Sequence, residues 1–498
     1  MALNNIDLHQ SCHLIDNEWV KGQGTSFQSY NPSTGKVLWV GSNATPDEVE
    51  NAFKAAKTAL PLWSRESLSV RQAIVEKFAD VVEKYSQSLA ELISLENGKP
   101  LWEAKTEVTS VIGKIKLSIQ AYEERCAQRT NHLGDDSLSC LRYKPYGVVA
   151  VLGAYNFPAH LSNGHIIPAL LAGNTVILKP SELTPAVSQL IMNCWLEAGI
   201  PSGVMNCIQG DGQTGQLLLS QPLSGVYFTG SYSTGKKIHQ TFADNPSIIL
   251  ALEMGGNNPL IIGDVADMNA AVYQTLLSCF ITSGQRCTCA RRVYIPNGDF
   301  GDKFIKALIQ ATEAITVGDG MSEKQPFMGP VISKHHAQVS LKGQEHLQSI
   351  GGKSLLTMSL LKENSGLLSP GIIDMSKAQR HYDEEIFAPL AQIYRYDTFD
   401  EAINAANNTK YGLSAGLLSD SKAQFDYFFD NIKAGIINWN KPTTGAAGNL
   451  PFGGIGCSGN HRPSGYFAVD YCAYPIASTQ ASHLTLPNDL MPGIRISQ

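Results

Sequence analysis

Short apolar runs alternate with longer segments of helical periodicity between residues 147 and 255. Each run is apolar at consecutive positions, which is typical of a strand buried on both faces of a sheet. The predicted strands are 147–152, 175–179, 204–208, 226–228 and 248–252, and the predicted helices between them are 159–172, 184–198, 212–220 and 234–242. This alternation predicts a doubly wound α/β domain with a parallel sheet, in which ligands bind at the carboxyl ends of the strands.

The same alternation returns after residue 260 and predicts a second α/β domain. Its predicted strands are 259–262, 292–295, 391–394 and 435–439, and its predicted helices are 268–281, 299–315 and 399–407.

The segments outside the two alternating regions have a different character. Residues 1–30 predict a short arm that leads into a turn at 31–35, and a helical layer follows at 47–60, 67–96 and 101–125. The segments 127–146 and 470–486 fit neither domain. The second of them has almost no charge, so we expect an edge strand that pairs with another subunit.

Composition and charge exclude several classes of protein. The chain has 498 residues, of which 16% are charged and 43% hydrophobic, with a net charge of −6. This composition excludes intrinsic disorder and argues against a nucleic-acid partner. The charge-free run 145–178 is interrupted by Asn, His and Pro residues, so we expect buried core and no membrane partner.

The ten cysteines and the first residues of the chain indicate a cytoplasmic protein. No C-x-x-C pair occurs, so the usual zinc and thioredoxin spacings are absent and we expect no metal site. Residues 1–20 lack the apolar core of a signal peptide, and we expect reduced, mostly buried thiols.

Three residues in predicted loops or strand ends could carry chemistry. Cys287 lies among small and polar residues in 284–288, where a thiol can act as a nucleophile, although a buried loop cysteine would look the same. Glu253 ends a buried strand before two glycines, where burial favours a general base or a carboxylate bound by backbone amides. The Asn156 amide could donate to an oxyanion or hold its own turn.

Other strand ends could hold a nucleotide. Lys179 and Glu182 end one strand, where they suit ribose hydroxyls or form a surface ion pair. Gly230 and Gly235 frame a strand-to-helix turn whose amides could face phosphate, although G-x-G-x-x-G is absent. A Gly/Pro loop at 449–454 is a candidate substrate wall or lid.

Together these motifs resemble the aldehyde dehydrogenase superfamily, in the family's order and over nearly the whole chain. The segments that carry the resemblance are 155–158, 179–182, 228–231, 252–256, 284–288, 385–387 and 451–454. The resemblance implies a Rossmann-like NAD-binding domain (1–126 with 147–254), a catalytic domain (255–455) and oligomerisation strands (127–146 with 470–486). It also implies a homodimer or a pair of dimers.

The resemblance implies a role for each candidate residue. Cys287 would attack the aldehyde carbon, Asn156 would stabilise the oxyanion, and Glu253 would activate the water that hydrolyses the thioester. Lys179 and Glu182 would contact the adenosine ribose, and Glu182 should repel a 2′-phosphate, so NAD is expected rather than NADP. The remaining cofactor-binding residues would be Gly230, Ser231, Tyr232, Ser233, Thr234 and Gly235 at the pyrophosphate and Glu385 and Phe387 near the nicotinamide.

Two residues depart from the family's pattern, because Asn257 replaces the usual Lys and Tyr155 replaces a common Trp. The segments 155–166 and 458–475 resemble a branch of the family that acts in arginine catabolism on a semialdehyde with two carboxylates. The alternatives are another carboxylated semialdehyde, such as succinate semialdehyde, and a thiol esterase. The candidate cations for the substrate carboxylates, which the sequence does not distinguish, are Arg286, Arg292, His461 and Arg462.

Overall fold

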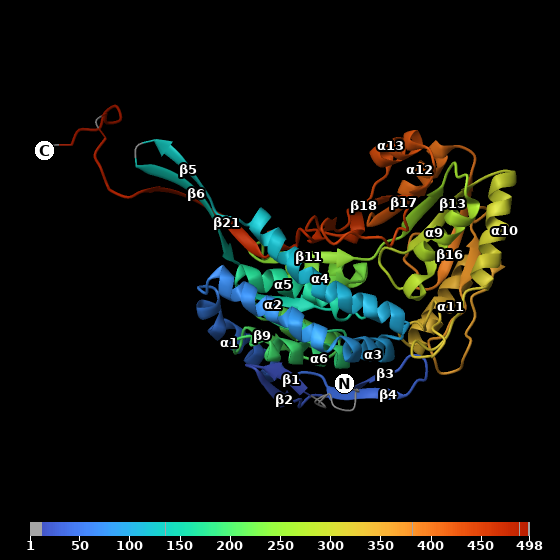
Figure 1. The fold of residues 1–498 in the computed structure, drawn as a ribbon, viewed down its shortest axis with the longest axis horizontal. Helices are drawn as coiled ribbons and strands as arrows, with labels where there is room; N and C mark the ends of the chain where they lie inside the picture. Colours follow the sequence, from blue (N-terminus) through green and yellow to red (C-terminus); the bar gives the residue numbers. More distant parts are fainter. Residues whose placement is uncertain (1–11, 135, 381, 488, 497–498) are drawn as a thin grey trace.

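The structure, a computed structural model, describes residues 12–496 apart from 135, 381 and 488. Two seven-stranded sheets dominate it and lie side by side in Figure 1. A smaller three-stranded sheet projects from the body formed by these two sheets (Figure 1). The α/β fold class expected from the sequence is confirmed.

The first sheet has the strand order β11-β10-β7-β8-β9-β1-β2. Its parallel strands are β7 (Val148–Leu152), β8 (Thr175–Lys179), β9 (Met205–Cys207), β10 (Gly225–Gly230) and β11 (Ile249–Met254). All five predicted strands are therefore confirmed. Strands β8 and β9 extend the sheet to one side of β7, and β10 and β11 extend it to the other. The order reverses between β7 and β10, where sheets of this kind open a ligand-binding crevice.

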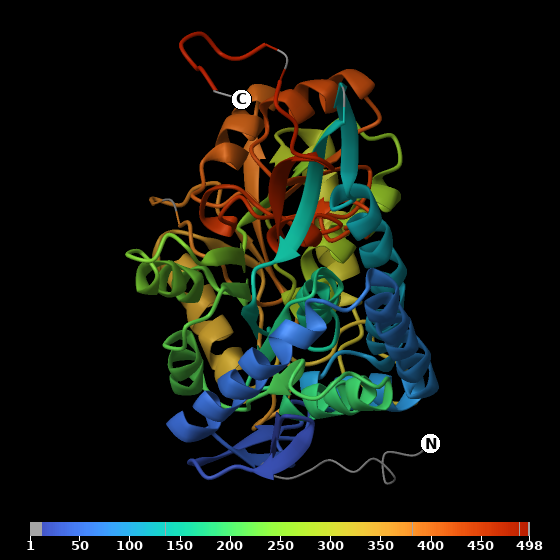
Figure 2. The same cartoon turned by 90° about the vertical axis from the view of Figure 1, so that its left-hand side faces the viewer.

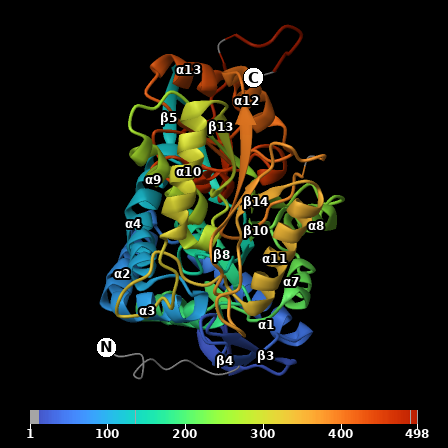
Figure 3. The same ribbon diagram turned by 90° about the vertical axis from the view of Figure 1, so that its right-hand side faces the viewer.

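Helices cover both faces of the first sheet. One face carries α2 (Leu68–Lys84), α3 (Ser86–Asn97), α4 (Leu101–Arg125), α5 (His160–Ala172) and α6 (Pro185–Glu197). The other carries α1 (Pro46–Trp63), α7 (Gly212–Leu219) and α8 (Tyr232–Thr241), which lie together in Figure 3. Alternate β7 residues pack on opposite faces, Val149 with the first group and Ala150 with the second, which explains the continuous apolar run.

The second sheet has the order β14-β15-β16-β13-β12-β17-β18. Its strands are β12 (Asn258–Ile262), β13 (Ala290–Pro296), β14 (Lys353–Leu356), β15 (Gly371–Asp374), β16 (Leu390–Tyr396), β17 (Ser414–Leu418) and β18 (Ile436–Trp439). Its helices are α9 (Met268–Phe280), α10 (Asp299–Glu313), α11 (Lys334–Ser349), α12 (Phe399–Asn407) and α13 (Lys422–Asn431). Strands β14, β15 and β17 and helices α11 and α13 were not among the predicted elements.

Two predictions near the N-terminus were wrong. Residues expected to form an arm instead form β1 (Cys12–Ile15), β2 (Glu18–Lys21) and β3 (Ser26–Tyr30), and β4 (Val37–Ser42) follows the turn. Strand β1 pairs with β9, so β1 and β2 extend the first sheet, whereas β3 and β4 form a two-stranded sheet of their own. The helix expected over 67–96 is two helices, because Tyr85 leaves helical geometry with φ −99° and ψ 12°.

The projecting sheet consists of β5 (Arg129–Gly134), β6 (Ser137–Pro145) and β21 (Ala473–Ala481). Strand β21 pairs with β6 of its own chain from Ala473 opposite Pro145 to Ala481 opposite Ser137 (Figure 2). The strand expected from the apolar C-terminal segment therefore exists, and its observed partner is intramolecular. Within the described part of the chain, none of the helices is long and apolar enough to cross a membrane.

Phe78 of α2 and Trp195 of α6 stack face to face in the core, with ring centroids 3.7 Å apart and both side chains fully buried. We expect Phe78→Ala to lower the free energy of unfolding by about 3–5 kcal/mol, because the stack is replaced by a cavity. Urea unfolding followed by circular dichroism measures the loss. Leu62→Ala, at a position that is 74% exposed, is the control and should change stability little. Equal effects of the two substitutions would contradict the packing argument.

Candidate active site

The three residues proposed for catalysis come from both large sheets. Asn156 follows β7, and Glu253 is the penultimate residue of β11 in the first sheet. Cys287 lies between the 3₁₀ turn η2 (Ile281–Gly284) and β13 of the second sheet. The amide nitrogen Nδ2 of Asn156 donates to the carbonyl of Gln285 at 3.0 Å, two residues before Cys287. The fold therefore brings the loops of Asn156 and Cys287 into direct contact.

The thiol of Cys287 is half-buried beside two carboxylates. Burial and, to a smaller extent, the negative charges of Glu385 and Glu253 together raise its pKa to about 12, whereas Arg291 opposes them. The thiol therefore lies close enough to both carboxylates to feel their charge. At neutral pH the thiol is protonated, so nucleophilic attack requires a base that accepts its proton.

The backbone before Cys287 is strained and is fixed by neighbouring groups. Thr282 and Ser283 both have φ of 55°, and Gly284 has φ of 71°. A Cβ at Gly284 would lie 2.0 Å from the carbonyl oxygen of Ala388, so the close approach requires glycine. The amide of Asn258 donates to the Cys287 carbonyl at 2.7 Å and to the Cys289 carbonyl at 2.8 Å. Such strain persists only where surrounding contacts define the loop.

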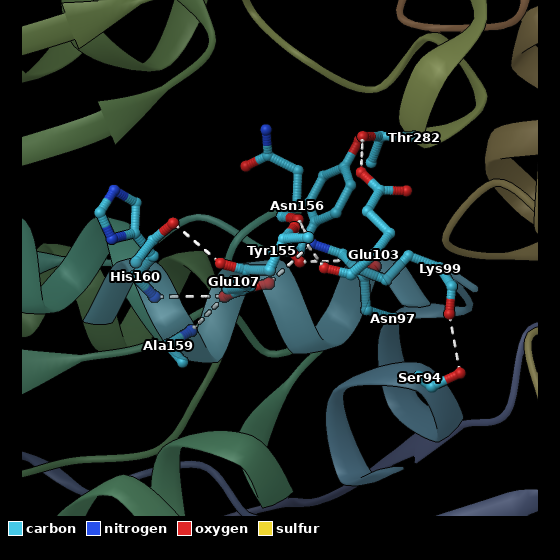
Figure 4. A network of polar contacts seen from close by, with 12 residues as sticks. Ser94, Asn97, Lys99, Glu103, Glu107, Tyr155, Asn156, Ala159, His160 and Thr282 are labelled. Carbon is cyan, nitrogen blue, oxygen red and sulfur yellow. Dashed lines mark hydrogen bonds and ion pairs between the residues drawn. The ribbon is translucent and has the colours of Figure 1, made fainter. Parts of the chain in front are cut away.

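A buried ion pair supports the Asn156 loop. Nζ of Lys99 lies 2.7 Å from a carboxylate oxygen of Glu107 and donates to the Asn156 carbonyl at 2.7 Å. The other carboxylate oxygen of Glu107 accepts from the backbone N–H groups of Ala159 and His160 (Figure 4). Both charged side chains are almost fully buried. The pair therefore fixes the backbone at Asn156 and at the start of the helix that follows it.

A second ion pair on the same helix supports the Cys287 loop. Arg286 contacts the buried carboxylate of Glu103 at 2.8 Å and donates from Nε to Thr282 Oγ1 at 2.7 Å. The hydroxyl of Thr282 also donates to Glu103. Helix α4 therefore braces both loops, through Glu107 on one side and Glu103 on the other.

Glu253 is a buried carboxyl group with few partners. Its Oε1 accepts from the backbone N–H of Ser464 at 3.2 Å, and its buried Oε2 has no hydrogen-bond partner among the described residues. Burial raises its pKa well above the usual value, and the hydrogen bond from Ser464 opposes this rise only in part. A Cβ at Gly453 would lie 3.0 Å from Oε1, so the glycine-rich loop closes over the carboxylate. A carboxylate with a raised pKa is a stronger base than an ordinary carboxylate, which suits a group that takes a proton from a reacting atom.

Several residues proposed for the cofactor follow strands β8 and β10, near the point where the strand order reverses. Ser231 caps α8, and its hydroxyl accepts from the N–H of Thr234 at 3.3 Å. The remaining first-turn amides of an α-helix have no intrahelical acceptor and can bind an anion. A Cβ at Gly235 would lie 2.4 Å from the Met254 sulfur, so glycine lets α8 sit close against the sheet. Tyr232 and Ser233 complete this exposed first turn.

Lys179 and Glu182 lie at the end of the neighbouring strand β8. Nζ of Lys179 is buried, donates to the Pro180 and Gly210 carbonyls, and lies 3.7 Å from Glu182. The Glu182 side chain is 45% exposed. A half-exposed carboxylate at the end of β8 can accept hydrogen bonds from ribose hydroxyls, so the residues present fit a dinucleotide.

Glu385 and Phe387 lie in the loop that precedes β16 of the second sheet. Arg291 lies 3.2 Å from Glu385, and its guanidinium lies over the Phe387 ring at 5.2 Å. A Cβ at Gly255 would lie 1.8 Å from Oε2 of Glu385, so glycine after β11 makes room for the carboxylate. Phe387 also meets Tyr155 edge to face, with centroids 6.2 Å apart.

The four candidate cations for substrate carboxylates have different surroundings. Arg292 is fully buried and donates to the carbonyls of Asn257, Ala405 and Ala406, so its role is structural. Arg286 is paired with Glu103. His461 and Arg462 are exposed. They lie between two residues that contact β11: the Asn460 side chain accepts from the Leu252 N–H, and the Ser464 N–H donates to Glu253.

Sequence reasoning missed the supporting residues of the site, which are Lys99, Glu103, Glu107, Asn258 and Arg291. Charged residues in a helix normally indicate a solvated face, and only the packing of α4 against both loops buries Glu103 and Glu107. The one available signal was the helical spacing, since residues four apart share a face of the helix.

Comparison with known proteins agrees with this geometry. The profile of the Aldehyde dehydrogenase family matches residues 19–475. The chain belongs to the aldehyde dehydrogenase family. It is 58% identical over 480 residues to N-succinylglutamate 5-semialdehyde dehydrogenase of Legionella pneumophila, which covers 96% of this chain and 97% of that protein. The protein of the same name from Pseudomonas fluorescens is 51% identical over 484 residues, 97% of this chain and 99% of that protein.

Solved structures show the same aldehyde dehydrogenase fold. Betaine aldehyde dehydrogenase of Staphylococcus aureus in complex with NAD⁺ superposes with a TM-score of 0.91 at 27% identity and covers 98% of both chains. An NADP-dependent enzyme of E. coli gives a TM-score of 0.90 at 28% identity, over 96% of this chain and all of the other. The family resemblance expected from the sequence is confirmed.

Lys99→Met should destabilise the protein by about 3–5 kcal/mol, because it leaves Glu107 buried without its counter-charge. It should also lower kcat, since the backbone of Asn156 loses its support. Lys105→Met, at an exposed position of α4, is the matched control. Urea unfolding and initial rates measure both effects, and indistinguishable behaviour of the two variants would contradict the bracing role of Lys99.

Proposed function

We propose that this aldehyde dehydrogenase oxidises N-succinylglutamate 5-semialdehyde to N-succinylglutamate with NAD, in the succinyltransferase route of arginine catabolism. The observation that carries the proposal is the 58% identity over 96% of the chain to a relative named for that reaction. The arrangement of Cys287, Asn156 and Glu253 supports it, because it supplies a nucleophile, an oxyanion donor and a base in one buried site.

Cys287 is the proposed nucleophile. Its Sγ forms a bond to the aldehyde carbon while the thiol proton passes to the Glu253 carboxylate, whose raised pKa makes it a stronger base than an ordinary carboxylate. The carbonyl oxygen becomes an oxyanion, and the Asn156 amide and the Cys287 backbone N–H donate to it. Preorganised donors of this kind stabilise the charge without reorganisation.

A bound NAD would supply the acceptor for the hydride of the substrate carbon, which leaves a thioester on Cys287. Glu253 releases the thiol proton to solvent before the second step. A water oxygen then forms a bond to the thioester carbon while its proton passes to Glu253, the C–S bond breaks, and the Cys287 sulfur takes that proton back from Glu253. The loop carrying Gly453 and Ser464 keeps this carboxylate buried, so bulk water does not compete for it. Splitting the oxidation into acyl transfer and hydrolysis gives two easier steps.

The proposed NAD site has three parts. Gly230 to Gly235 would face the pyrophosphate, Lys179 and Glu182 the adenosine ribose, and Glu385 with Phe387 the nicotinamide end. This division follows the chain's own geometry, since the first two parts lie on the first sheet and the third faces them from the second.

We infer that residues 1–126 with 147–254 bind NAD, that 255–455 carry the catalytic cysteine, and that 127–146 with 470–486 contact another subunit. The projecting position of β5, β6 and β21 supports the last assignment (Figure 1). The free edge of β21 offers unpaired backbone groups to a second chain. We propose a homodimer or a pair of dimers in the cytoplasm.

An aldehyde panel tests the proposed reaction. With NAD, kcat/KM for N-succinylglutamate 5-semialdehyde should exceed that for succinate semialdehyde and for hexanal, measured as NADH absorbance. Cys287→Ala should lower turnover by at least about a thousandfold, because the covalent route is lost. A higher kcat/KM for succinate semialdehyde would show that the proposed substrate is wrong. Robust turnover by Cys287→Ala would refute the thiol mechanism.

Glu182→Gln should raise the ratio of kcat/KM with NADP to that with NAD by about tenfold, because it removes a carboxylate that repels the 2′-phosphate. Glu384→Gln, a neutralisation at an exposed ion pair with Lys410, serves as the control and should leave the ratio unchanged. An unchanged ratio in Glu182→Gln would contradict the placement of the adenosine ribose.

A further inference from the structure

Three lysines are buried among the described residues, and one of them lacks a carboxylate partner. Lys99 pairs with Glu107, and Lys179 lies near Glu182. Lys114 of α4 is only 6% exposed, yet its Nζ makes no ion pair within the described part of the chain. Its hydrogen bond goes to the backbone carbonyl of Gly465, at 2.5 Å. A buried ammonium without a counter-charge is costly, which points to an anion that the protein itself does not provide.

Lys114 lies beside the proposed catalytic site. Gly465, which accepts its hydrogen bond, follows Ser464, whose N–H donates to the Glu253 carboxylate. Two adjacent residues, Ser464 and Gly465, therefore connect Lys114 to the proposed base Glu253. Ser464 and Gly465 form the short strand β20 (Ser464–Gly465), which pairs with β19 (Pro451–Phe452) of the glycine-rich loop.

His160 adds a polar atom with no partner to the same neighbourhood. Its buried Nδ1 has no hydrogen-bond partner among the described residues. Burial, together with the charges of Lys114 and Lys99, lowers the pKa of His160 to about 4, so the ring is neutral at pH 7. A neutral imidazole can donate from one nitrogen. An ammonium and an imidazole with unused hydrogen-bonding capacity together suit a carboxylate.

We propose that Lys114 binds a carboxylate of the semialdehyde substrate, an inference that rests on the function proposed above. The substrate places its aldehyde carbon between Cys287 and Glu253, and its carboxylates follow several bonds further along. Lys114 is linked to Glu253 through Gly465 and Ser464, so we place one of these carboxylates beside it. Of the other buried cations near the site, Arg286 is paired with Glu103 and Arg292 binds backbone carbonyls. Lys114 thus determines specificity, because its ammonium favours binding of a carboxylated aldehyde over an uncharged one.

The test compares Lys114→Met with Lys116→Met, a control at an exposed position of the same helix. For N-succinylglutamate 5-semialdehyde, Lys114→Met should lower kcat/KM about ten- to hundredfold, mainly through KM, because a charge-assisted hydrogen bond is lost. For hexanal, kcat/KM should change less than about threefold, since no carboxylate is present. Lys116→Met should resemble the wild type on both substrates.

Equal losses on both aldehydes would overturn the proposal, because Lys114 would then only anchor Gly465. Unchanged kinetics on both would also overturn it. If the wild type shows no preference for N-succinylglutamate 5-semialdehyde, the proposed function fails. In that case, kcat/KM of Lys114→Met is compared on succinate semialdehyde and on hexanal. A loss of kcat/KM for succinate semialdehyde alone still supports carboxylate binding by Lys114, and the absence of a selective loss refutes it.

A measurement on the wild type keeps the proposal testable if Lys114→Met does not fold. Burial lowers the pKa of Lys114 to about 8, while the nearby Cys472 opposes the shift. His160 and His165 of α5 also face it, and both are neutral above pH 6 because burial lowers their pKa values. A bound carboxylate favours the protonated lysine, so the ratio of kcat/KM for the carboxylated aldehyde to that for hexanal should fall as pH rises above about 8. A ratio that stays constant from pH 7 to about pH 9.5 would refute the proposal.

Discussion

The buried ammonium of Lys99 holds together the part of the molecule on which the proposed chemistry depends. It joins α4, through Glu107, to the carbonyl of Asn156, and Glu107 in turn holds the backbone at the start of α5. An ion pair in a low-dielectric interior is costly to break, since either partner alone would be an uncompensated charge. The loop of Asn156 is therefore fixed by an interaction that tolerates little movement.

Helix α4 extends this constraint to the second sheet. Glu107 braces the loop after β7, and Glu103, one turn earlier, braces the strained turn before Cys287 through Arg286 and Thr282. Further along the same helix, Lys114 donates to the carbonyl of Gly465, and the adjacent Ser464 donates to the Glu253 carboxylate. One helix thus positions groups from both sheets, which explains how loops far apart in the chain keep a constant geometry.

The electrostatics of the site follow from burial. Burial raises the pKa values of Cys287 and Glu253, and the carboxylates of Glu253 and Glu385 add to the effect at the thiol. Arg291 moderates this charge because it is paired with Glu385 and bound to the Gly284 carbonyl. The site therefore keeps the thiol protonated and places a base with a raised pKa beside it.

The sequence by itself determined the two alternating α/β regions, because strands such as β7 and β8 are buried on both faces and appear as continuous apolar runs. It also indicated the family, since the motifs around Asn156, Glu253 and Cys287 are local. Strands β1 to β4 and β14 escaped prediction because they are short and partly exposed, and α11 because its periodicity is weak among polar residues. Only the tertiary structure decided which charges are buried and paired, because Lys99, Glu107 and Lys114 meet their surroundings through packing between segments distant in the chain.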